Sequence, residues 1–551
     1  MSTVDATALD PTGSATKESS VDPQPTRRFG CGRAAMVAVG VVAVVGVVAR
    51  ILVLRSPIGN LNADEAYVGV EAFEVLAGRF PVVLGGTNYT AVLEAYLYAP
   101  VVVVFGASIW TLKMIPILMW LLASLVTARI AWERLGGDRS DTSDIAGTTG
   151  ARPNQQMACW AGVSALVMMW IAPGSLMEIS TRTYASYVSG MLVLALIFLL
   201  SSRLIDRVDP RPVPAGVVGF LAGLGFWMHP MFLSVLVPIV AVVLIVHRHR
   251  AARRVVWPAV VIGGLVGSGP YLVWNLFNGF ESRSLPAQFE GSYIDRLEVF
   301  WRELFPRAFG LRGAQMQWHL PFGISLVVAA VLLAATIGGA IIVWRRGTGP
   351  SRILLAVVLV CVLPLMALFP PLIFSADGRY GIIALPFIVV AIAATVAELL
   401  GWMARRWHED RRRSARLVGV AAVLVAFWAA AYVLPEGRTW LSLRYAQPNS
   451  GLFETLELLD EAGFNHYYGS WWAMTPVEFI ADRRAIGGTF GGFEKRPFER
   501  RSEIVLAQAP TGVAFLLEGR HDRDELLFMP ADHYRRFQIG PTTVLVPIDG
   551  P

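Results

Sequence analysis

A series of apolar segments constrains the fold of this chain more than any other feature of its sequence. About eleven of them are long enough to cross a hydrocarbon core of about 30 Å as helices. A mean hydropathy of +0.53, with 16% charged residues among 551, excludes a string of soluble domains. The sequence therefore predicts a polytopic α-helical membrane protein. The segments lie near residues 34–54, 109–130, 157–173, 184–204, 214–228, 231–247, 255–276, 321–344, 353–372, 381–401 and 417–434.

The N-terminal stretch differs from the rest in composition. Residues 1–33 are rich in Ser, Thr, Pro, Asp and Ala and lack apolar periodicity, so we expect a disordered cytoplasmic tail. The run from Ala34 to Leu54 is about a full bilayer span and predicts a membrane anchor rather than a cleaved signal peptide. The three cysteines, Cys31, Cys159 and Cys361, lie in or beside apolar runs and predict no disulfide framework and no cysteine metal site.

Charge decides how a further apolar segment, residues 91–106, is interpreted. The segment is short, carries Glu94 and contains Pro100. If it crossed the membrane, the arginine clusters at 248–254 and 405–416 would lie outside, against the positive-inside rule. We therefore predict that it lies in the outer interface or re-enters it, which also keeps Glu94 out of hydrocarbon.

This topology predicts a transmembrane domain over 34–434 with outer loops at 55–108 and 277–320, and an outer tail at 435–551. The tail changes composition sharply and is long enough for its own core. Its patterns predict a small extracytoplasmic α/β domain. Helices are expected at 452–459 and 476–481, and strands at 466–469, 513–517 and 542–547.

Two adjacent acids open the first outer loop. Asp64 and Glu65 begin a stretch with helical apolar spacing over 64–77, which predicts an amphipathic helix on the outer surface. One interpretation is structural, because Asn62 is a good N-cap and Glu65 stands where its capping-box partner would be. The other is functional, because the acids lie at the level of a lipid head group and Glu94 follows in the same loop.

Several short motifs resemble the GT-C membrane glycosyltransferases. Within this family they look like the protein O-mannosyltransferase and lipid A aminoarabinose transferase type. The resemblance rests on Asp64-Glu65, Leu93–Leu97, Phe226–Pro230, Arg379-Tyr380 before Leu385-Pro386, and, more loosely in the tail, Tyr467-Tyr468 and Trp471-Trp472 before Phe479-Ile480. It implies that Asp64 is the catalytic base. It also implies a polyprenyl-phosphate sugar donor and an acceptor outside the cytoplasm.

The expected chemistry needs one base and nearby positive charge. Asp64 would take a proton from an acceptor hydroxyl while that oxygen attacks the anomeric carbon and expels polyprenyl phosphate. Arg182 and Arg379 are each the only basic residue of a short outer loop, and a guanidinium suits a phosphate. We assign them, with His229, to the donor phosphate, and Lys113 is a weaker candidate. The alternative is that the arginines pair locally with Glu178 and Asp377 or extend to lipid head groups.

The remaining candidates support this site. Glu65 and Glu94 are expected as supporting acids, and Tyr67, Tyr380, Trp318 and His319 as acceptor or sugar contacts. Trp318 and His319 are equally consistent with interfacial anchors. The aromatic residues Tyr467, Tyr468, Trp471 and Trp472 would either stack on a sugar or pack the core of the tail.

Other functions remain open at this stage. A transporter or flippase of envelope precursors fits the number of spans, but several spans carry no Asp, Glu, Lys or Arg. A noncatalytic membrane scaffold is a further alternative. No cofactor is predicted, and use of a divalent metal is left open. We expect a multi-pass protein of a bacterial cytoplasmic membrane that contacts lipid and no nucleic acid, with a glycan, lipid or protein acceptor.

Overall fold

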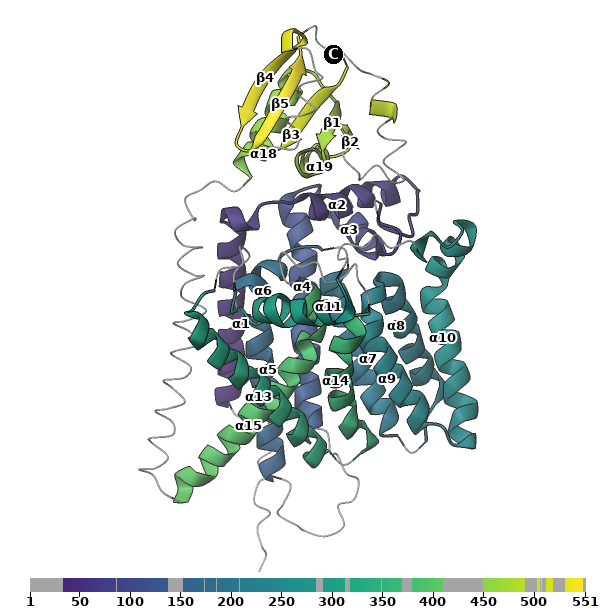
Figure 1. Ribbon diagram of the computed structural model, residues 1–551, viewed down its shortest axis with the longest axis vertical. Coiled ribbons are helices and arrows are strands. Elements are labelled where there is room, and N and C mark those ends of the chain that lie inside the picture. Colours follow the sequence, from purple (N-terminus) through teal and green to yellow (C-terminus); the bar gives the residue numbers. More distant parts are fainter. Residues whose placement is uncertain are drawn as a thin grey trace, which may run out of the picture.

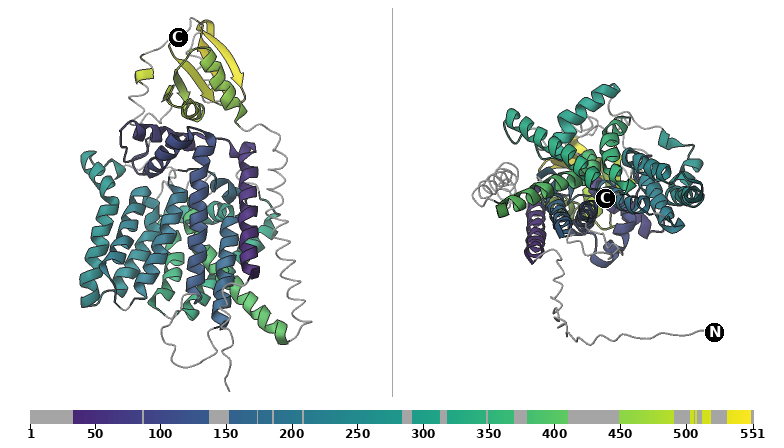
Figure 2. Two further views of the ribbon diagram at one scale, coloured as in Figure 1. Left: turned by 180° about the vertical axis from the view of Figure 1, so that it is seen from behind. Right: turned by 90° about the horizontal axis from the view of Figure 1, so that it is seen from below.

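The computed structural model describes residues 33–85, 87–136, 152–172, 174–184, 186–207, 209–283, 291–312, 318–347, 349–368, 379–409, 449–490, 503–505, 507, 512–518 and 531–548. Within these ranges a bundle of long helices carries a small sheet domain at one end (Figure 1). Helices α1 and α10 lie on opposite sides of the bundle (Figure 2).

The predicted apolar segments coincide with helices wherever the structure describes them. The bundle helices are α1 (Arg33–Leu54), α4 (Ile109–Arg134), α5 (Arg152–Trp170), α7 (Tyr187–Ile205), α8 (Pro212–Met228), α9 (Leu233–Val246), α10 (Arg250–Phe277), α13 (Phe322–Arg346), α14 (Leu354–Met366) and α15 (Leu385–Glu409). Among the described residues, 5 helices are long and apolar enough to cross a membrane by length and composition, and shorter apolar helices accompany them. The segment 417–434 lies outside the described residues, so the number of spans stays a prediction.

Small residues let two of these helices approach closely. A Cβ atom on Gly219 or Gly223 of α8 would lie 2.1 Å from a carbonyl oxygen of α10. The same distance applies to Gly263 and Gly267 of α10 against carbonyl oxygens of α8. Only glycine fits at such positions, and this form of helix packing is frequent in membranes.

Helix α1 packs along α5, where Arg50 is 1% exposed. Its guanidinium donates to the carbonyl oxygen of Trp170, at the end of α5, over 3.1 Å. Cys159 of α5 is disulfide-bonded, and its partner lies outside the described residues. The sequence predicted no disulfide framework and did not anticipate this single bond, because spacing along a sequence does not tell which cysteines the fold brings together.

The first outer loop forms two helices across the end of the bundle, α2 (Ala63–Leu76) and α3 (Leu93–Phe105) (Figure 1). The side chain of Asn62 accepts a hydrogen bond from the backbone N–H of Glu65 over 2.9 Å, so the predicted N-cap is confirmed. Helix α3 corresponds to the segment 91–106. Its placement relative to the membrane stays a prediction, as do the domain boundaries.

The sheet domain contains the expected elements and two further strands. Its helices are α18 (Ser450–Glu461) and α19 (Trp471–Ile480). The strands are β1 (His466–Ser470), β2 (Ile486–Phe490), β3 (Ala514–Glu518), β4 (Tyr534–Ile539) and β5 (Thr542–Pro547), in the spatial order β2-β1-β3-β5-β4. Strands β2, β1 and β3 are parallel, whereas β5 and β4 are antiparallel to their neighbours. The expected α/β domain is confirmed.

Helix α19 joins the sheet domain to the bundle by packing on α2. The rings of Tyr67 and Trp471 lie 4.8 Å apart, and those of Phe73 and Phe479 are stacked at 5.7 Å. We expected α2 to expose a polar face at the surface. Instead Tyr67 is 2% exposed, because α19 covers that face.

Candidate functional site

Asp64 and Arg379 form an ion pair near the end of the bundle that carries the sheet domain. Asp64 stands in the first turn of α2, and Arg379 opens the 3-10 helix η8 (Arg379–Ala384) that leads into α15. Nη1 of Arg379 donates to Oδ2 of Asp64 over 2.9 Å, and the two side chains are 24% and 29% exposed. Both groups are therefore within reach of a ligand. The fold brings the predicted base next to the predicted phosphate ligand.

Aromatic rings surround the guanidinium of Arg379. Its Cζ atom lies 5.2 Å from the ring centroid of Tyr184, 5.8 Å from that of Tyr187 and 5.5 Å from that of Tyr380. Tyr380 itself meets Tyr187 edge to face at 5.3 Å. Such rings attract a cation through their electron-rich faces, so they hold the guanidinium in place without neutralising its charge.

Tyr89, in the first outer loop, adds a neutral phenol to this environment. Burial, followed by the charge of Tyr380, raises the pKa of Tyr89 to about 12, although the nearby charge of Arg379 opposes this rise. Its ring also meets that of His229 edge to face at 5.4 Å. Tyr89 therefore keeps its proton near neutral pH and can donate a hydrogen bond.

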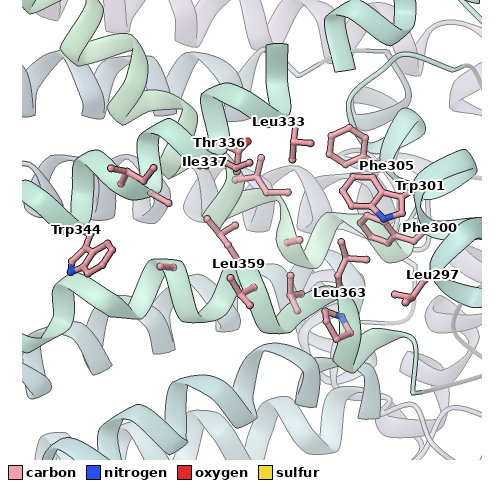
Figure 3. Close-up of a pocket in the computed structure, with 18 residues that line it drawn as sticks. Leu297, Phe300, Trp301, Phe305, Leu333, Thr336, Ile337, Trp344, Leu359 and Leu363 are labelled. Atoms are coloured by element: carbon pink, nitrogen blue, oxygen red, sulfur yellow. The ribbon is translucent and has the colours of Figure 1, made fainter. Parts of the chain in front are cut away.

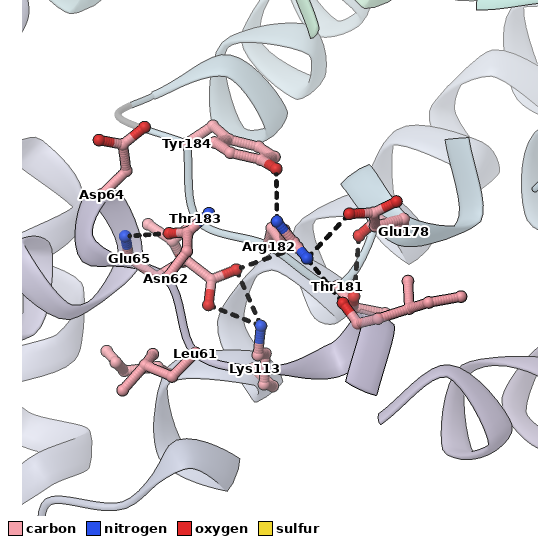
Figure 4. A network of polar contacts seen from close by, with 12 residues as sticks. Leu61, Asn62, Asp64, Glu65, Lys113, Glu178, Thr181, Arg182, Thr183 and Tyr184 are labelled. Atoms are coloured by element: carbon pink, nitrogen blue, oxygen red, sulfur yellow. Dashed lines mark hydrogen bonds and ion pairs between the residues drawn. The ribbon is translucent and has the colours of Figure 1, made fainter. Parts of the chain in front are cut away.

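Glu65 points away from Asp64 into a buried network (Figure 4). Its two carboxylate oxygens accept hydrogen bonds from Nζ of Lys113 over 2.8 and 2.6 Å. Both side chains are 1% exposed. Removing one partner of such a buried pair lowers the free energy of unfolding by several kcal/mol. The pair fixes the first turn of α2 against α4, and Asp64 is the residue before Glu65.

Arg182 is part of the same network. It ion-pairs with Glu178 at 2.8 Å and lies 3.8 Å from Glu65. It also donates to the hydroxyl of Tyr184 over 3.0 Å and to the carbonyl oxygen of Ile58 over 2.6 Å. This is the local pairing with Glu178 that the sequence left open. The pairing that it left open between Arg379 and Asp377 falls on a residue outside the described ones.

Glu94, in the first turn of α3, reaches the start of α7. Its Oε1 atom accepts a hydrogen bond from the hydroxyl of Ser189 over 2.6 Å, and the side chain is buried. The carboxylate thus lies at the N-terminus of α7, where a negative charge is favourable. Glu94 thereby ties α3 to the helix that carries Tyr187. Its role as a supporting acid stays a prediction.

His229 is fully buried in the connection between α8 and η3 (Pro230–Phe232). Its Nδ1 atom accepts from the backbone N–H of Met231 over 3.1 Å, and Nε2 lies 3.3 Å from the hydroxyl of Tyr187. Burial, followed by the charge of Arg379, lowers the pKa of His229 to about 3. The ring is therefore neutral near pH 7 and acts on the site through Tyr187.

Of the four predicted sugar contacts, Tyr380 lies beside the pair of Asp64 and Arg379, and the other three have different neighbours. Tyr380 lies against Arg379, whereas the hydroxyl of Tyr67 donates to Glu71 and its ring faces α19. Trp318 packs under the guanidinium of Arg312 at 4.3 Å and lines a cavity of about 790 Å³. The backbone N–H of His319 donates to the carbonyl oxygen of Leu311 over 3.2 Å. Substrate contacts by Tyr67, Trp318 and His319 stay predictions.

An apolar cavity of about 550 Å³ lies between α13, α14, α15 and the π-helical segment η5 (Phe300–Leu304). Figure 3 shows aromatic rings of η5 and its neighbours at one end and Trp344 at the other. Ala384 of η8 and Ile388 of α15 also line it, so the cavity approaches the element that carries Arg379. Its lining suits a hydrocarbon chain.

The sequence did not identify the partner of Lys113 or the aromatic surround of Arg379. A lysine inside an apolar segment needs a partner, which was a signal for Glu65. Tyr184 and Tyr187, three positions apart where the apolar segment 184–204 begins, were a signal for two of these rings. Across the described ranges, no group of three or more His, Cys, Asp and Glu side chains is arranged to hold a metal ion.

Solved structures with the same fold are found, although no family model and no curated protein matches the sequence. The chain is similar to ArnT from Cupriavidus metallidurans in the apo state, with a TM-score of 0.57, 13% identity and coverage of 93% of this chain and 98% of that one. ArnT bound to undecaprenyl phosphate gives a TM-score of 0.51 and 12% identity, covering 92% of this chain and 97% of that one. An Archaeoglobus fulgidus oligosaccharyltransferase gives 0.46 and 13%, covering 93% of this chain and 74% of that one.

The fold predicted from the sequence is therefore confirmed. It is GT-C-like, with a polytopic helical part and a small C-terminal α/β domain. The resemblance to the lipid A aminoarabinose transferase type, which rested on short motifs, is also confirmed at the level of the fold.

Proposed function

We propose that this chain is an inverting glycosyltransferase that moves a sugar from a polyprenyl-phosphate donor to an extracytoplasmic acceptor. The observation that carries the proposal is the ion pair of Asp64 and Arg379, partly exposed at the outer end of a GT-C-like bundle. A carboxylate and a guanidinium are the base and the phosphate ligand that this reaction needs. The protein would work at the outer face of a bacterial cytoplasmic membrane, on a glycan, lipid or protein acceptor.

The reaction is a single displacement. Asp64 takes the proton of an acceptor hydroxyl while that oxygen forms a bond to the anomeric carbon. The bond between this carbon and the phosphate oxygen breaks, and polyprenyl phosphate leaves with the electron pair. One base is sufficient because phosphate leaves as a stable anion, whereas glycosidases use two carboxyl groups.

Arg379 receives the negative charge of the leaving group. Its guanidinium can bind two phosphate oxygens at once, and the three tyrosine rings fix its orientation. In the structure, Arg379 is paired with Asp64. A bound phosphate would take over the guanidinium and leave the carboxylate to accept the proton, so donor binding prepares the base.

The buried network positions these two groups. Arg182 holds Tyr184, whose ring faces Arg379, and also approaches Glu65. Lys113 holds Glu65, the neighbour of Asp64. We therefore assign Arg182 and Lys113 to positioning, and His229 to holding Tyr187. The base and the phosphate ligand are thus fixed from two sides, as efficient catalysis requires.

The apolar cavity beside η8 would hold part of the isoprenoid chain. Its volume of about 550 Å³ is within the range of ligand sites of about 300–1,000 Å³. Charged side chains are absent from its lining among the described residues. The proposal thus accounts for both ends of the donor.

The test is transfer of a radiolabelled sugar from polyprenyl-phosphate donors in membranes that contain the protein or its Asp64→Asn variant. The proposal expects transfer by the wild type and its loss in the variant. Equal transfer by both proteins, or transport of the donor without transfer, would contradict it.

A further inference from the structure

A second pocket lies where the sheet domain meets the outer end of the bundle. It has a volume of about 340 Å³ and lies between α18, α19, the turn from β4 to β5, and the Asn60-Leu61 segment that precedes α2. It shares no residue with the apolar cavity or with the pair of Asp64 and Arg379. A ligand there would touch both parts of the protein.

One member of the tail's aromatic cluster, Trp472, lines this pocket. Among the described residues of the cluster, it is also the one that is exposed. Trp472 is 51% exposed, whereas Tyr467 is 1% and Trp471 is 6% exposed. Tyr467 and Trp471 pack in the cores of the domain and of its interface. The structure thus separates the two uses that the sequence left open for this cluster, because three of its rings pack internally and one faces a pocket.

Two asparagines, Asn60 and Asn449, line the pocket together with Trp472. The backbone N–H of Asn449 donates to Oδ1 of Asn60 over 3.0 Å, and the backbone N–H of Leu61 donates to Oδ1 of Asn449 over 2.8 Å. Within the described part of the chain, these bonds use the oxygen of each amide and leave the NH₂ groups as donors. Thr542 adds a hydroxyl to the lining.

Charge is absent from this lining, as far as the chain is described. Its members are all neutral residues, and the polar ones carry amides or hydroxyls. A phosphate or a carboxylate would find no cation here. A hydrocarbon chain would leave the amides and hydroxyls without partners, which is unfavourable.

We propose that this pocket binds a neutral glycan. A sugar ring has an apolar face of C–H groups, which fits the exposed indole of Trp472, and a rim of hydroxyls, which fits the amides and Thr542. If the proposed function holds, this glycan is the acceptor, and that part of the inference rests on the proposed function. Leu61 and Asp64 are three positions apart in the chain, so the backbone between them spans at most about 11 Å. A bound oligosaccharide could therefore extend from the pocket towards the base.

Direct binding is the first test. The full-length protein in lipid nanodiscs is titrated calorimetrically with mannotetraose, arabinotetraose, galactotetraose and cellotetraose, and with tetragalacturonate as a charged comparison. We expect at least one neutral tetrasaccharide to bind, and tetragalacturonate to bind at least ten-fold more weakly than galactotetraose. Absence of binding by all four neutral probes, or equal binding of the charged one, overturns the inference.

Two variants locate the binding in this pocket. Trp472→Ala removes the stacking surface, and Gly451→Met fills the pocket from α18, where a Cβ atom would meet Ile539 at an ordinary 3.6 Å. Phe453→Ala is the matched control, because Phe453 is 49% exposed on the same helix and does not line the pocket. Each of the first two should weaken tetrasaccharide binding at least five-fold, and the control should not. An unchanged melting temperature checks that the domain is folded.

The outcomes for the glycan pocket and for the proposed function are separable. Asp64→Asn should abolish sugar transfer and keep tetrasaccharide binding. Binding that depends on Trp472 in a protein that transfers no sugar supports the pocket and refutes the proposed function. Transfer to a glycan acceptor with an unchanged acceptor KM in both Trp472→Ala and Gly451→Met overturns the pocket and leaves the proposed function standing.

Discussion

Oδ2 of Asp64 and Nη1 of Arg379 lie 2.9 Å apart, although 315 positions separate the two residues in the chain. Asp64 comes from the start of α2 and Arg379 from the start of η8. Each is fixed by its own surroundings, Asp64 through the Glu65–Lys113 pair and Arg379 through three tyrosine rings. The surrounding structure therefore holds both side chains of the pair in place, and the effects of replacing them can be predicted.

Replacing Asp64 by Asn should reduce sugar transfer by about 10²–10⁴-fold, which is the usual contribution of a general base. The amide keeps the size of the side chain, so the fold should be retained. Radiolabelled transfer at saturating donor measures the effect. Glu74→Gln is the control, since Glu74 lies on the same helix and pairs with an exposed arginine; it should transfer at nearly the wild-type rate. A similar loss in both variants would show that helix α2, and not the carboxylate, is what matters.

Replacing Arg379 by Gln should weaken binding of undecaprenyl phosphate by about 10–100-fold, because charge-assisted hydrogen bonds contribute about 1.5–3 kcal/mol each. Arg379→Lys keeps the charge but loses two-point binding of the phosphate, so an intermediate effect is expected. Calorimetry in nanodiscs measures the affinity. Arg79→Gln removes a charge that is 64% exposed in the same outer loop and should change little. An Arg379→Gln protein with normal affinity contradicts the assignment.

The Glu65–Lys113 pair predicts non-additive stability. Glu65→Gln or Lys113→Met alone leaves a buried charge without its partner and should cost about 3–5 kcal/mol of unfolding free energy. The double variant should recover most of that loss, because both charges are removed together. It should still transfer sugar with a reduced kcat, since Asp64 loses its anchor. If the two single losses simply add, the side chains are not coupled. Equilibrium unfolding in detergent measures the free energies.

His229 predicts a loss of stability in acid. Its pKa is lowered to about 3 in the folded protein, against about 6.5 for an unperturbed histidine. Between these values the unfolded chain binds the additional proton, so stability falls as pH decreases below about 6.5. From pH 7 to pH 5 the loss from this residue should be about 2 kcal/mol. His229→Asn keeps an acceptor for the N–H of Met231 and should remove this part of the pH dependence. An identical pH profile in both proteins contradicts the prediction.

The apolar cavity predicts selection by donor chain length. Ala340→Phe, which fills it from α13, should raise the KM for an undecaprenyl donor at least five-fold. A two-isoprene donor, too short to fill the cavity, should be affected much less. Val331→Phe changes an exposed position on the same helix and serves as the control. Equal effects on both donors would place the isoprenoid chain elsewhere.

Local signals in the sequence predicted most of the elements. The apolar runs that fall within the described residues, the N-cap Asn62 and the strands β1, β3 and β5 correspond to structure. The strands β2 and β4 were missed. Both are edge strands, and β2 contains two glycines whereas β4 contains two arginines. Edge strands carry weaker apolar patterns because only one of their neighbours is a strand. Gly487 of β2 is instead selected by close packing, because a Cβ atom there would collide with Met474.

The candidate site could be predicted in part. The sequence alone determined that Asp64 opens a helix after the first apolar segment and that Arg379 precedes the last described bundle helix, because hydropathy, helix caps and loop charges are read within a few residues. Only the tertiary structure decided that Arg379 meets Asp64, that Lys113 and Arg182 converge on Glu65, and that Trp472 faces a pocket. Such pairings depend on how distant helices pack, and no local pattern along the chain encodes that packing.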